Sequence, residues 1–344
     1  MAKTRPEFGK DALRSDEIAI IAPARLHLGF YDLHGGNGRL FGSLGVGINE
    51  IYTHVTASES KDVIVRGESR GRASNYVGRI LEYFDIDQGV TVTVHKAIPE
   101  HTGLGSGTQL SLAIAHAVAG LFDKKINIAS ISRILDRGNR SGVGIGTFKH
   151  GGIVVDGGRG VDTIVPPVIS HQDFPEAWRL LLVIDHGIQG INGIPEIEAF
   201  KNLPPMEEST SEYLCRLILT RLLPSVSEED CRVFGMALAE MQTIIGDYFA
   251  PAQGGRFSSH LVEEVLQPLI PQGATAVGQS SWGPAGFALF ENETRAYHGL
   301  RKIRENYKDN NRLEFRICSG RNYGAEIVRR QSNVDFNYGR RSHN

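Results

Sequence analysis

The stretch from 98 to 118, IPEHTGLGSGTQLSLAIAHAV, joins an apolar extended segment to a helical one through a glycine-rich turn. Its glycines allow positive φ angles and a close approach of the backbone to a ligand; they are Gly103, Gly105 and Gly107. The hydroxyl groups of Ser106 and Thr108 and the first free N–H groups of the helix supply donors, and the helix dipole favours an anion. Such turns also occur for purely structural reasons. The helical apolar spacing that follows favours a phosphate or pyrophosphate site on a buried helix.

The same turn excludes two common nucleotide-binding motifs. The chain has no G-x-x-x-x-G-K-[ST] sequence, and the G-x-G-x-G spacing lacks the third glycine position of a dinucleotide fingerprint. The turn resembles instead the second motif of the GHMP superfamily of small-molecule kinases, P-x-x-x-G-L-G-S-S-A. The matching positions are Pro99, Gly103, Leu104, Gly105 and Ser106. Gly107 stands where those kinases carry a second serine that helps to hold Mg-ATP, which argues against ATP chemistry.

Further segments make the resemblance narrower. The sequences IAPARLHLGFYDLHGGNGRLFGSLGVGI, HTGLGSGTQ, GNRSGVGIGTFKHGGIVVDGG and VGQSSWGPAGFALF are similar to those of the β-ribofuranosylaminobenzene 5'-phosphate synthase family. The resemblance covers roughly residues 18 to 328. It implies a pentosyltransferase that joins phosphoribosyl pyrophosphate to 4-aminobenzoate or 4-hydroxybenzoate and releases CO2 and pyrophosphate. The pathway implied is the biosynthesis of tetrahydromethanopterin. An ATP-dependent GHMP small-molecule kinase is the alternative, and a binding protein without turnover is a third reading.

The pattern of elements predicts an α+β protein. Strands are predicted over 18–30, 48–58, 62–66, 90–98, 178–185, 285–290 and 312–318. Helices are predicted over 75–84, 108–122, 128–137, 207–223, 228–249, 259–269 and 294–306. The resemblance implies a two-domain GHMP-kinase-like fold, with an N-terminal ribosomal-protein-like βαβ domain, a C-terminal ferredoxin-like domain and the site in the cleft between them.

The domain boundary is expected within the proline-bearing stretch 165–175. The first domain is then 17–168, with the glycine-rich phosphate loop, and the second is 176–328. The tails 1–16 and 329–344 are expected to be flexible, and the basic residues of the second tail are interpreted as a solvated end rather than a nucleic-acid arm.

Composition excludes several classes of protein. Of 344 residues, 41% are hydrophobic and 22% are charged, and no apolar run approaches the ~18 residues of a membrane span. The net charge of -2 does not suit general binding to nucleic acid. The N-terminal sequence lacks the apolar core of a secretory signal, so we expect a cytoplasmic protein. Cys215, Cys231 and Cys318 are interpreted as reduced thiols. A homodimer is expected by family likeness only.

The first predicted strand carries three candidate catalytic residues, Arg25, His27 and Asp32. Arg25 and His27 are two apart and project to one face. The Arg25 guanidinium suits a carboxylate or a phosphate, although an ion pair at the sheet edge is the alternative. His27 is equally interpreted as an interior histidine. Asp32 either forms the turn before His34 or acts as the ligand of a Mg2+ cofactor.

A second set of phosphate-competent groups lies between 140 and 156. Its candidate binding residues are Arg140, Ser141 and Lys149, among several glycines. Two glycine-rich loops suit phosphoribosyl pyrophosphate, because this substrate has a 5'-phosphate and a pyrophosphate. A structural crossover between strands is the alternative, and Asp156 is expected to be a turn residue.

The late segment VGQSSWGPAGFALF adds Ser280, Ser281 and Trp282 as candidate substrate-binding residues. Trp282 is a candidate to stack on the aromatic substrate, with a core position as the alternative. Ser280 or Ser281 is a candidate to bond a phosphate or a carboxylate. Glu196 and Glu198 are explained by the charge preference of a helix start.

Overall fold

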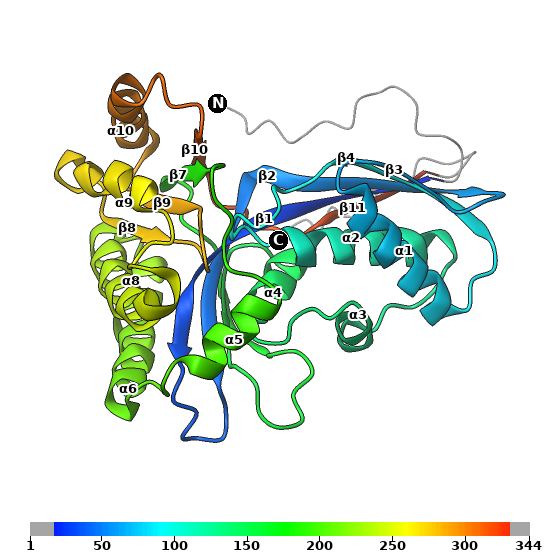
Figure 1. Ribbon diagram of the computed structural model, residues 1–344, viewed down its shortest axis with the longest axis horizontal. Helices are drawn as coiled ribbons and strands as arrows, with labels where there is room; N and C mark the ends of the chain where they lie inside the picture. The colour runs from blue at the N-terminus through cyan, green and yellow to red at the C-terminus, as the bar shows by residue number, and fades with distance from the viewer. Residues whose placement is uncertain (1–16, 331–344) are drawn as a thin grey trace, which may run out of the picture.

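Strand pairing divides the chain into two sheets in the computed structural model, which describes residues 17–330 (Figure 1). The first sheet has the order β11-β1-β2-β4-β3, and β5 pairs with both β2 and β6. The second sheet has the order β10-β7-β9-β8 and is antiparallel throughout. The strands are β1 (Glu17–Asp32), β2 (Phe41–Ser60), β3 (Ile64–Gly67), β4 (Gly89–Lys96), β5 (Ile153–Asp156), β6 (Val168–Gln172), β7 (Arg179–Asp185), β8 (Ala276–Gln279), β9 (Gly286–Phe290), β10 (Leu313–Cys318) and β11 (Glu326–Arg330).

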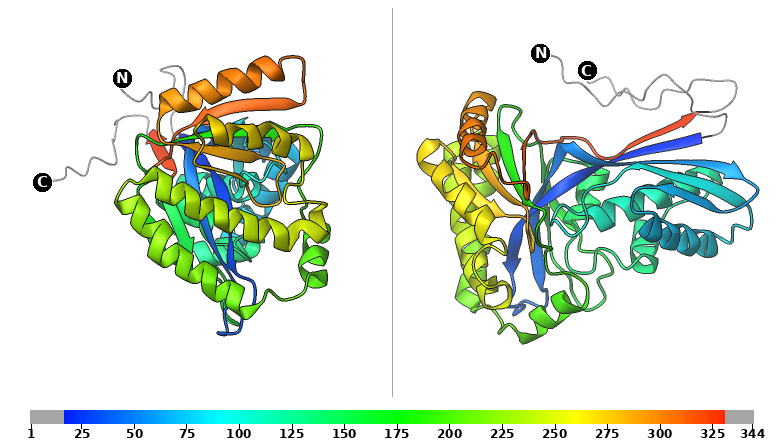
Figure 2. Two further views of the ribbon diagram at one scale, coloured as in Figure 1. Left: turned by 90° about the vertical axis from the view of Figure 1, so that its left-hand side faces the viewer. Right: turned by 45° about the horizontal axis from the view of Figure 1, so that its top comes forward.

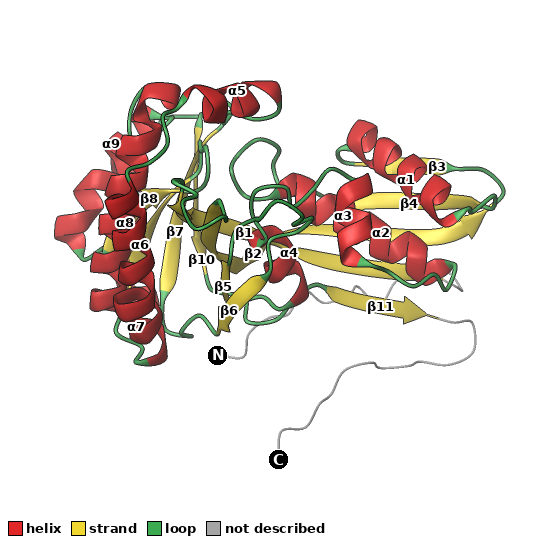
Figure 3. Cartoon of the chain, turned by 90° about the horizontal axis from the view of Figure 1, so that it is seen from below, coloured by secondary structure: helices red, strands yellow, loops and turns green. Residues whose placement is uncertain are grey.

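Helices gather at the two ends of the molecule. Figure 3 shows α1, α2 and α3 at one end and α6, α8 and α9 at the other. The α-helices are α1 (Arg70–Phe84), α2 (Ser106–Leu121), α3 (Ile128–Ile134), α4 (Val143–Lys149), α5 (Ile194–Asn202), α6 (Glu208–Leu217), α7 (Leu223–Ser227), α8 (Cys231–Gln253), α9 (His260–Leu266) and α10 (Glu293–Asn306). None of those within residues 17–330 is both long and apolar enough to cross a membrane.

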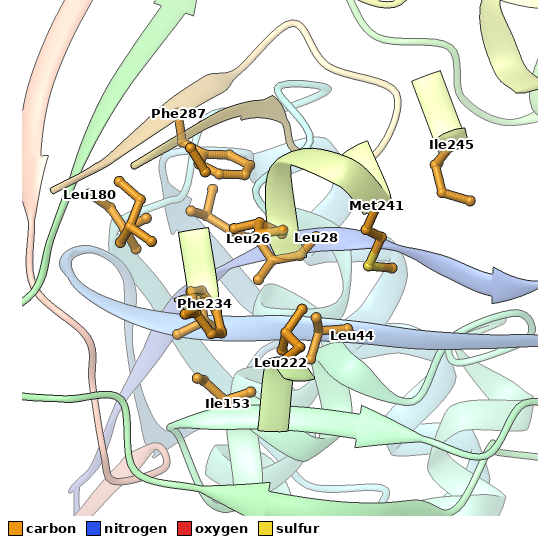
Figure 4. Close-up of a cluster of buried hydrophobic side chains, with 14 of the residues drawn as sticks. Leu26, Leu28, Leu44, Ile153, Leu180, Leu222, Phe234, Met241, Ile245 and Phe287 are labelled. Atoms are coloured by element: carbon orange, nitrogen blue, oxygen red, sulfur yellow. The ribbon is translucent and has the colours of Figure 1, made fainter. Parts of the chain in front are cut away.

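The long strand β1 is shared by two hydrophobic cores. Its residues Ile18 and Ile20 belong to the core that α1 and α2 cover. Its residues Leu26 and Leu28 belong to a second core, with Phe234 of α8 and residues of the second sheet (Figure 4). Residues alternate across a strand, so Arg25 and His27 lie on the opposite face of β1 from Leu26 and Leu28. One strand therefore carries both the packing between the halves and two candidate site residues.

The predicted α+β class and the predicted elements are confirmed, with three corrections. The segment 140–156, expected to be a glycine-rich loop, contains the helix α4, whose glycines allow close packing: a Cβ on Gly146 would lie 2.6 Å from Val154 Cγ1. The expected boundary 165–175 contains β6, which pairs with β5. Arg329 belongs to β11, which pairs with β1 and returns the chain to the first sheet (Figure 2). The predicted tails 1–16 and 331–344 lie outside the described residues.

Candidate functional site

The glycine-rich turn ends at the first turn of α2. Gly103 and Gly105 have φ angles of 81° and 83°, in the left-handed region that favours glycine. A Cβ on Gly103 would lie 2.2 Å from the carbonyl oxygen of Ser280. Gly105 precedes α2 without a side-chain cap, and the first turn, from Ser106 through Gly107 and Thr108, contains no acidic residue. A helix start of this kind favours an anion, and the first turn has no carboxylate that would compete with it.

Arg25 lies beside this turn. Its Nη1 donates to the carbonyl oxygen of Gly103 at 2.6 Å, and its backbone N–H donates to Leu104 at 3.1 Å. A Cβ on Gly105 would lie 3.1 Å from Arg25 Cγ. The Nε atom is buried and has no hydrogen-bond partner. Burial lowers the pKa of Arg25 to about 10, and nearby Glu196 opposes this effect, so the side chain stays cationic at neutral pH.

His27 is buried next to a small cavity. Only 3% of the residue is exposed, its ring centroid lies 4.6 Å from that of Phe30, and Nε2 has no partner. Burial, and then Arg25, lower the pKa of His27 to about 3. The imidazole is therefore neutral at physiological pH. With Ser281 and Trp282 it lines a cavity of about 30 Å³, close to the volume of one water molecule or one small polar group.

Asp32 lies at the far end of β1. Its Oδ1 accepts hydrogen bonds from the backbone N–H groups of His34 at 3.1 Å and Gly35 at 3.0 Å, so the carboxylate holds a turn. An extended strand advances about 3.3 Å per residue, which separates Asp32 from Arg25 by on the order of 20 Å. The structure does not bring these two candidates together. Among residues 17–330, no group of three or more His, Cys, Asp and Glu side chains is arranged to hold a metal ion.

The residues of the second glycine-rich segment separate into three environments. Arg140 Nη1 pairs with Glu196 Oε1 at 3.0 Å, and the Arg140 guanidinium lies 4.8 Å from the ring centroid of Phe200. Ser141 Oγ lies 2.6 Å from Ser43 Oγ, at the start of α4. Lys149 lies at the other end of α4 and is exposed. Lys149 is therefore not brought together with Arg140 and Ser141.

Asp156 is a turn residue, as expected, and it is also a buried anchor for the start of α4. It is 0% exposed, and it accepts hydrogen bonds from the backbone N–H groups of Gly142 at 2.8 Å and Gly158 at 2.9 Å. Burial raises its pKa. Since Gly142 precedes α4, the carboxylate fixes the start of that helix, and no free acid remains there for a ligand.

The late segment joins the second half of the chain to the glycine-rich turn. Ser280 Oγ donates to Gly103 at 2.7 Å and accepts from the backbone N–H of His27 at 3.0 Å, so its hydroxyl is occupied. The backbone N–H of Ser281 donates to the carbonyl oxygen of His27 at 3.0 Å. Trp282 is 6% exposed, donates from Nε1 to Glu196 at 3.2 Å, and packs among aromatic rings. Its position is that of a core residue at the edge of the site.

Two residues of this region were missed or undervalued by sequence reasoning. Glu196 pairs with Arg140 and Trp282, so it links α5 to the site instead of acting only as a helix-start charge. Arg137 lies against Gly107, with a separation of 3.0 Å between its Cζ and a Cβ built on that glycine. No motif marks Arg137; only the unusual Gly107 signals that a neighbour fills the space of a side chain.

Comparison with known proteins identifies the family of the chain. Residues 75–152 match the family described as GHMP kinases N terminal domain, and residues 224–309 match GHMP kinases C terminal. A beta-ribofuranosylphenol 5'-phosphate synthase of Methanothermobacter thermautotrophicus is 32% identical over 295 residues, which cover 79% of this chain and 88% of that protein. A protein of the same name from Archaeoglobus fulgidus is 30% identical over 326 residues, which cover 90% of this chain and 99% of that protein.

The fold is also similar to that of homoserine kinase from Cytophaga hutchinsonii, with a TM-score of 0.61 and 15% identity over 94% of this chain and 100% of that chain. This likeness concerns the fold alone. The sequence relatives are more specific, since they are 30–32% identical to this chain over most of both chains. The chain therefore belongs to the β-ribofuranosylphenol 5'-phosphate synthase family and has the two-domain GHMP kinase fold that its motifs predict.

Proposed function

We propose that the protein is a decarboxylating C-ribosyltransferase of tetrahydromethanopterin biosynthesis. It joins phosphoribosyl pyrophosphate to 4-hydroxybenzoate or 4-aminobenzoate and releases CO2 and pyrophosphate. The observation that carries the proposal is the similarity to relatives named for a ribofuranosylphenol 5'-phosphate product, over nearly their whole length. A homodimer and a cytoplasmic location stay predictions.

The chemistry needs no nucleophile from the protein. The C1–O bond of the ribose breaks and its electron pair leaves with pyrophosphate, while the ring carbon that bears the carboxylate bonds to C1. The bond to the carboxylate then breaks, its electron pair restores the aromatic ring, and CO2 leaves. The site must hold both substrates in line and exclude water from the cationic sugar.

Three features of the site support this reaction. The N–H groups of α2 and the Arg25 guanidinium suit the departing pyrophosphate, whose negative charge grows as the C1–O bond breaks. The neutral His27 imidazole can hydrogen-bond the amino or hydroxyl group of the acceptor, and the adjoining cavity has the volume of such a group. Both substrates then lie along one face of β1, because Arg25 and His27 are two residues apart.

Mg2+ was expected with Asp32 as its ligand, and the donor groups do not fit this expectation. The Asp32 carboxylate holds a turn, and the described residues offer no cluster of metal ligands around it. Mg2+ usually keeps several waters and binds substrate phosphates. We therefore propose Mg2+ only as a counter-ion that accompanies the diphosphate substrate.

The test compares two reactions of the purified protein. With phosphoribosyl pyrophosphate, carboxyl-labelled 4-hydroxybenzoate or 4-aminobenzoate is expected to release labelled CO2 together with pyrophosphate. With ATP and an alcohol such as homoserine or mevalonate, no ADP is expected. ADP formation without release of CO2 would overturn the proposal in favour of the kinase alternative.

A further inference from the structure

The first turn of α2 is covered by a guanidinium group. A Cβ built on Gly107 would lie 3.0 Å from Arg137 Cζ, 3.1 Å from Nη1 and 3.2 Å from Nη2. The three distances are nearly equal, so the planar group lies flat over the glycine. Any side chain at this position must therefore shift the Arg137 guanidinium by a few tenths of an ångström, and a serine, which is larger than a single methyl group, shifts it more than an alanine.

Arg137 is held in place from two sides. Its backbone N–H donates to the carbonyl oxygen of Ser132 at 2.7 Å, and Asp136, with φ of 54°, donates to Arg133 at 3.2 Å. This pattern closes the end of α3 in the manner of a Schellman motif and fixes the backbone. On the other side, Arg137 Nη2 donates to the hydroxyl of Tyr76 in α1, whose ring centroid lies 5.6 Å from Cζ. The guanidinium is thus preorganised over α2.

Among the described residues Arg137 forms no ion pair with a carboxylate, and its buried Nε has no partner. The same is true of Arg25 Nε, at the neighbouring Gly105. The intervening turn of α2 offers N–H groups and no acidic residue. Two guanidinium groups thus flank the first turn of α2, one against Gly105 and one against Gly107, and a multiply charged anion at this turn supplies a counter-charge for Arg137.

We propose that Arg137 binds the diphosphate group of the substrate at the first turn of α2, and that Gly107 is required because it makes room for this guanidinium. The inference rests on the proposed function for the identity of the substrate. Within that reaction Arg137 stabilises the charge that the pyrophosphate oxygen acquires when the C1–O bond breaks.

The experiment measures binding of inorganic pyrophosphate to the full-length protein by calorimetry. Arg137→Gln and Gly107→Ser are expected to weaken binding by about 10- to 100-fold, the loss of one or two hydrogen bonds to a charged group. Arg137→Lys keeps the charge and is expected to lose less pyrophosphate affinity than Arg137→Gln. Arg133→Gln, an exposed arginine of α3, is the matched control and is expected to leave the affinity unchanged.

Two further variants separate binding from a structural role. Tyr76→Phe removes the hydrogen bond to α1 but keeps the guanidinium, so its effect is expected to be much smaller than that of Arg137→Gln. Gly107→Ala adds a helix-favouring residue, and it is expected to weaken pyrophosphate binding without lowering Tm. A structural role alone would instead make affinity and Tm fall together.

The outcome is independent of turnover. Reduced pyrophosphate affinity in folded Arg137→Gln supports the inference even when the unmodified protein forms no labelled CO2. Absence of labelled CO2 in the unmodified protein would contradict the proposed function alone. Equal affinities of Arg137→Gln and the unmodified protein, at equal Tm, would overturn the inference even when CO2 release is intact. Absence of pyrophosphate binding to the unmodified protein would overturn it as well.

Discussion

Several side chains of the site are buried with a polar atom that lacks a partner. Arg25 Nε, His27 Nε2 and Arg137 Nε are all in this state. A buried polar atom without a hydrogen bond costs about 1–3 kcal/mol, so three of them in one region represent a considerable cost to the folded protein. Sites that bind charged or polar ligands carry such costs because the ligand removes them. At the residue scale, Arg25, His27 and Arg137 are therefore the side chains of this region that a polar or charged ligand would stabilise.

Arg25→Ala is expected to reduce kcat/KM for phosphoribosyl pyrophosphate by an amount equivalent to about 2–4 kcal/mol, because a cation next to the anion site is lost. The measurement is the initial rate of labelled CO2 release at low donor concentration. Arg25→Lys is the control, since it keeps the charge but not the planar guanidinium group. Its kcat/KM is expected to lie between the values of the unmodified protein and of Arg25→Ala. An unchanged kcat/KM in Arg25→Ala would return Arg25 to a structural role.

His27 gives the protein a pH-dependent stability. Its pKa is lowered from 6.5 to about 3 by burial, so between these values the unfolded chain binds one more proton than the native chain. The free energy of unfolding therefore rises with pH in this window and falls as the pH decreases below 6.5. Between pH 7 and pH 4.5, His27 is expected to lower the free energy of unfolding of the unmodified protein by on the order of 2 kcal/mol. His27→Gln is expected to lack this part of the decrease.

Urea unfolding at the two pH values measures this difference. His298→Gln, an exposed histidine of α10, is the control and is expected to keep the pH dependence of the unmodified protein. Equal pH dependence in His27→Gln and the unmodified protein would contradict a neutral, buried His27.

At the scale of elements, glycine has different structural roles at α1 and at the start of α2. Gly105 precedes α2 with a φ of 83°, and a Cβ there would lie 3.1 Å from Arg25 Cγ. Gly78 lies inside α1, and a Cβ there meets no atom within 4 Å. The glycine pattern of a sequence does not distinguish these cases. It also suggests a loop within 140–156, where small residues instead allow α4 to pack closely on β5.

Gly78→Ala is expected to stabilise the protein by about 0.5–1 kcal/mol, because alanine favours a helix and loses less backbone entropy on folding. Gly105→Ala is expected to destabilise it by about 1–2 kcal/mol, the cost of a left-handed conformation for a residue with a Cβ. Urea unfolding measures both changes. Only Gly105→Ala is expected to lower kcat/KM, and normal pyrophosphate release by this variant would show that the turn is not part of the site.

At the scale of the whole molecule, the limits of sequence reasoning follow from distance along the chain. The strand that carries Arg25 and the turn before α2 are local patterns, and both could be predicted. The pairing of β11 with β1 and the bond between Ser280 and Gly103 join residues far apart, the latter pair separated by 177 positions. Such contacts leave no periodic signal. Arg137 escaped prediction for the same reason, since it reaches the site only after α1, α2 and α3 have packed together.

Ser280→Ala tests whether the contact between the two halves supports the whole structure. The variant removes a buried hydroxyl that donates to Gly103 and accepts from the backbone N–H of His27, which is then left unpaired. The free energy of unfolding is expected to fall by about 1–3 kcal/mol. Urea unfolding followed by tryptophan fluorescence measures the change, and Ser209→Ala, on an exposed position of α6, is the control. A change within about 0.5 kcal/mol of that control would mean that apolar packing around β1, rather than this polar contact, joins the two halves.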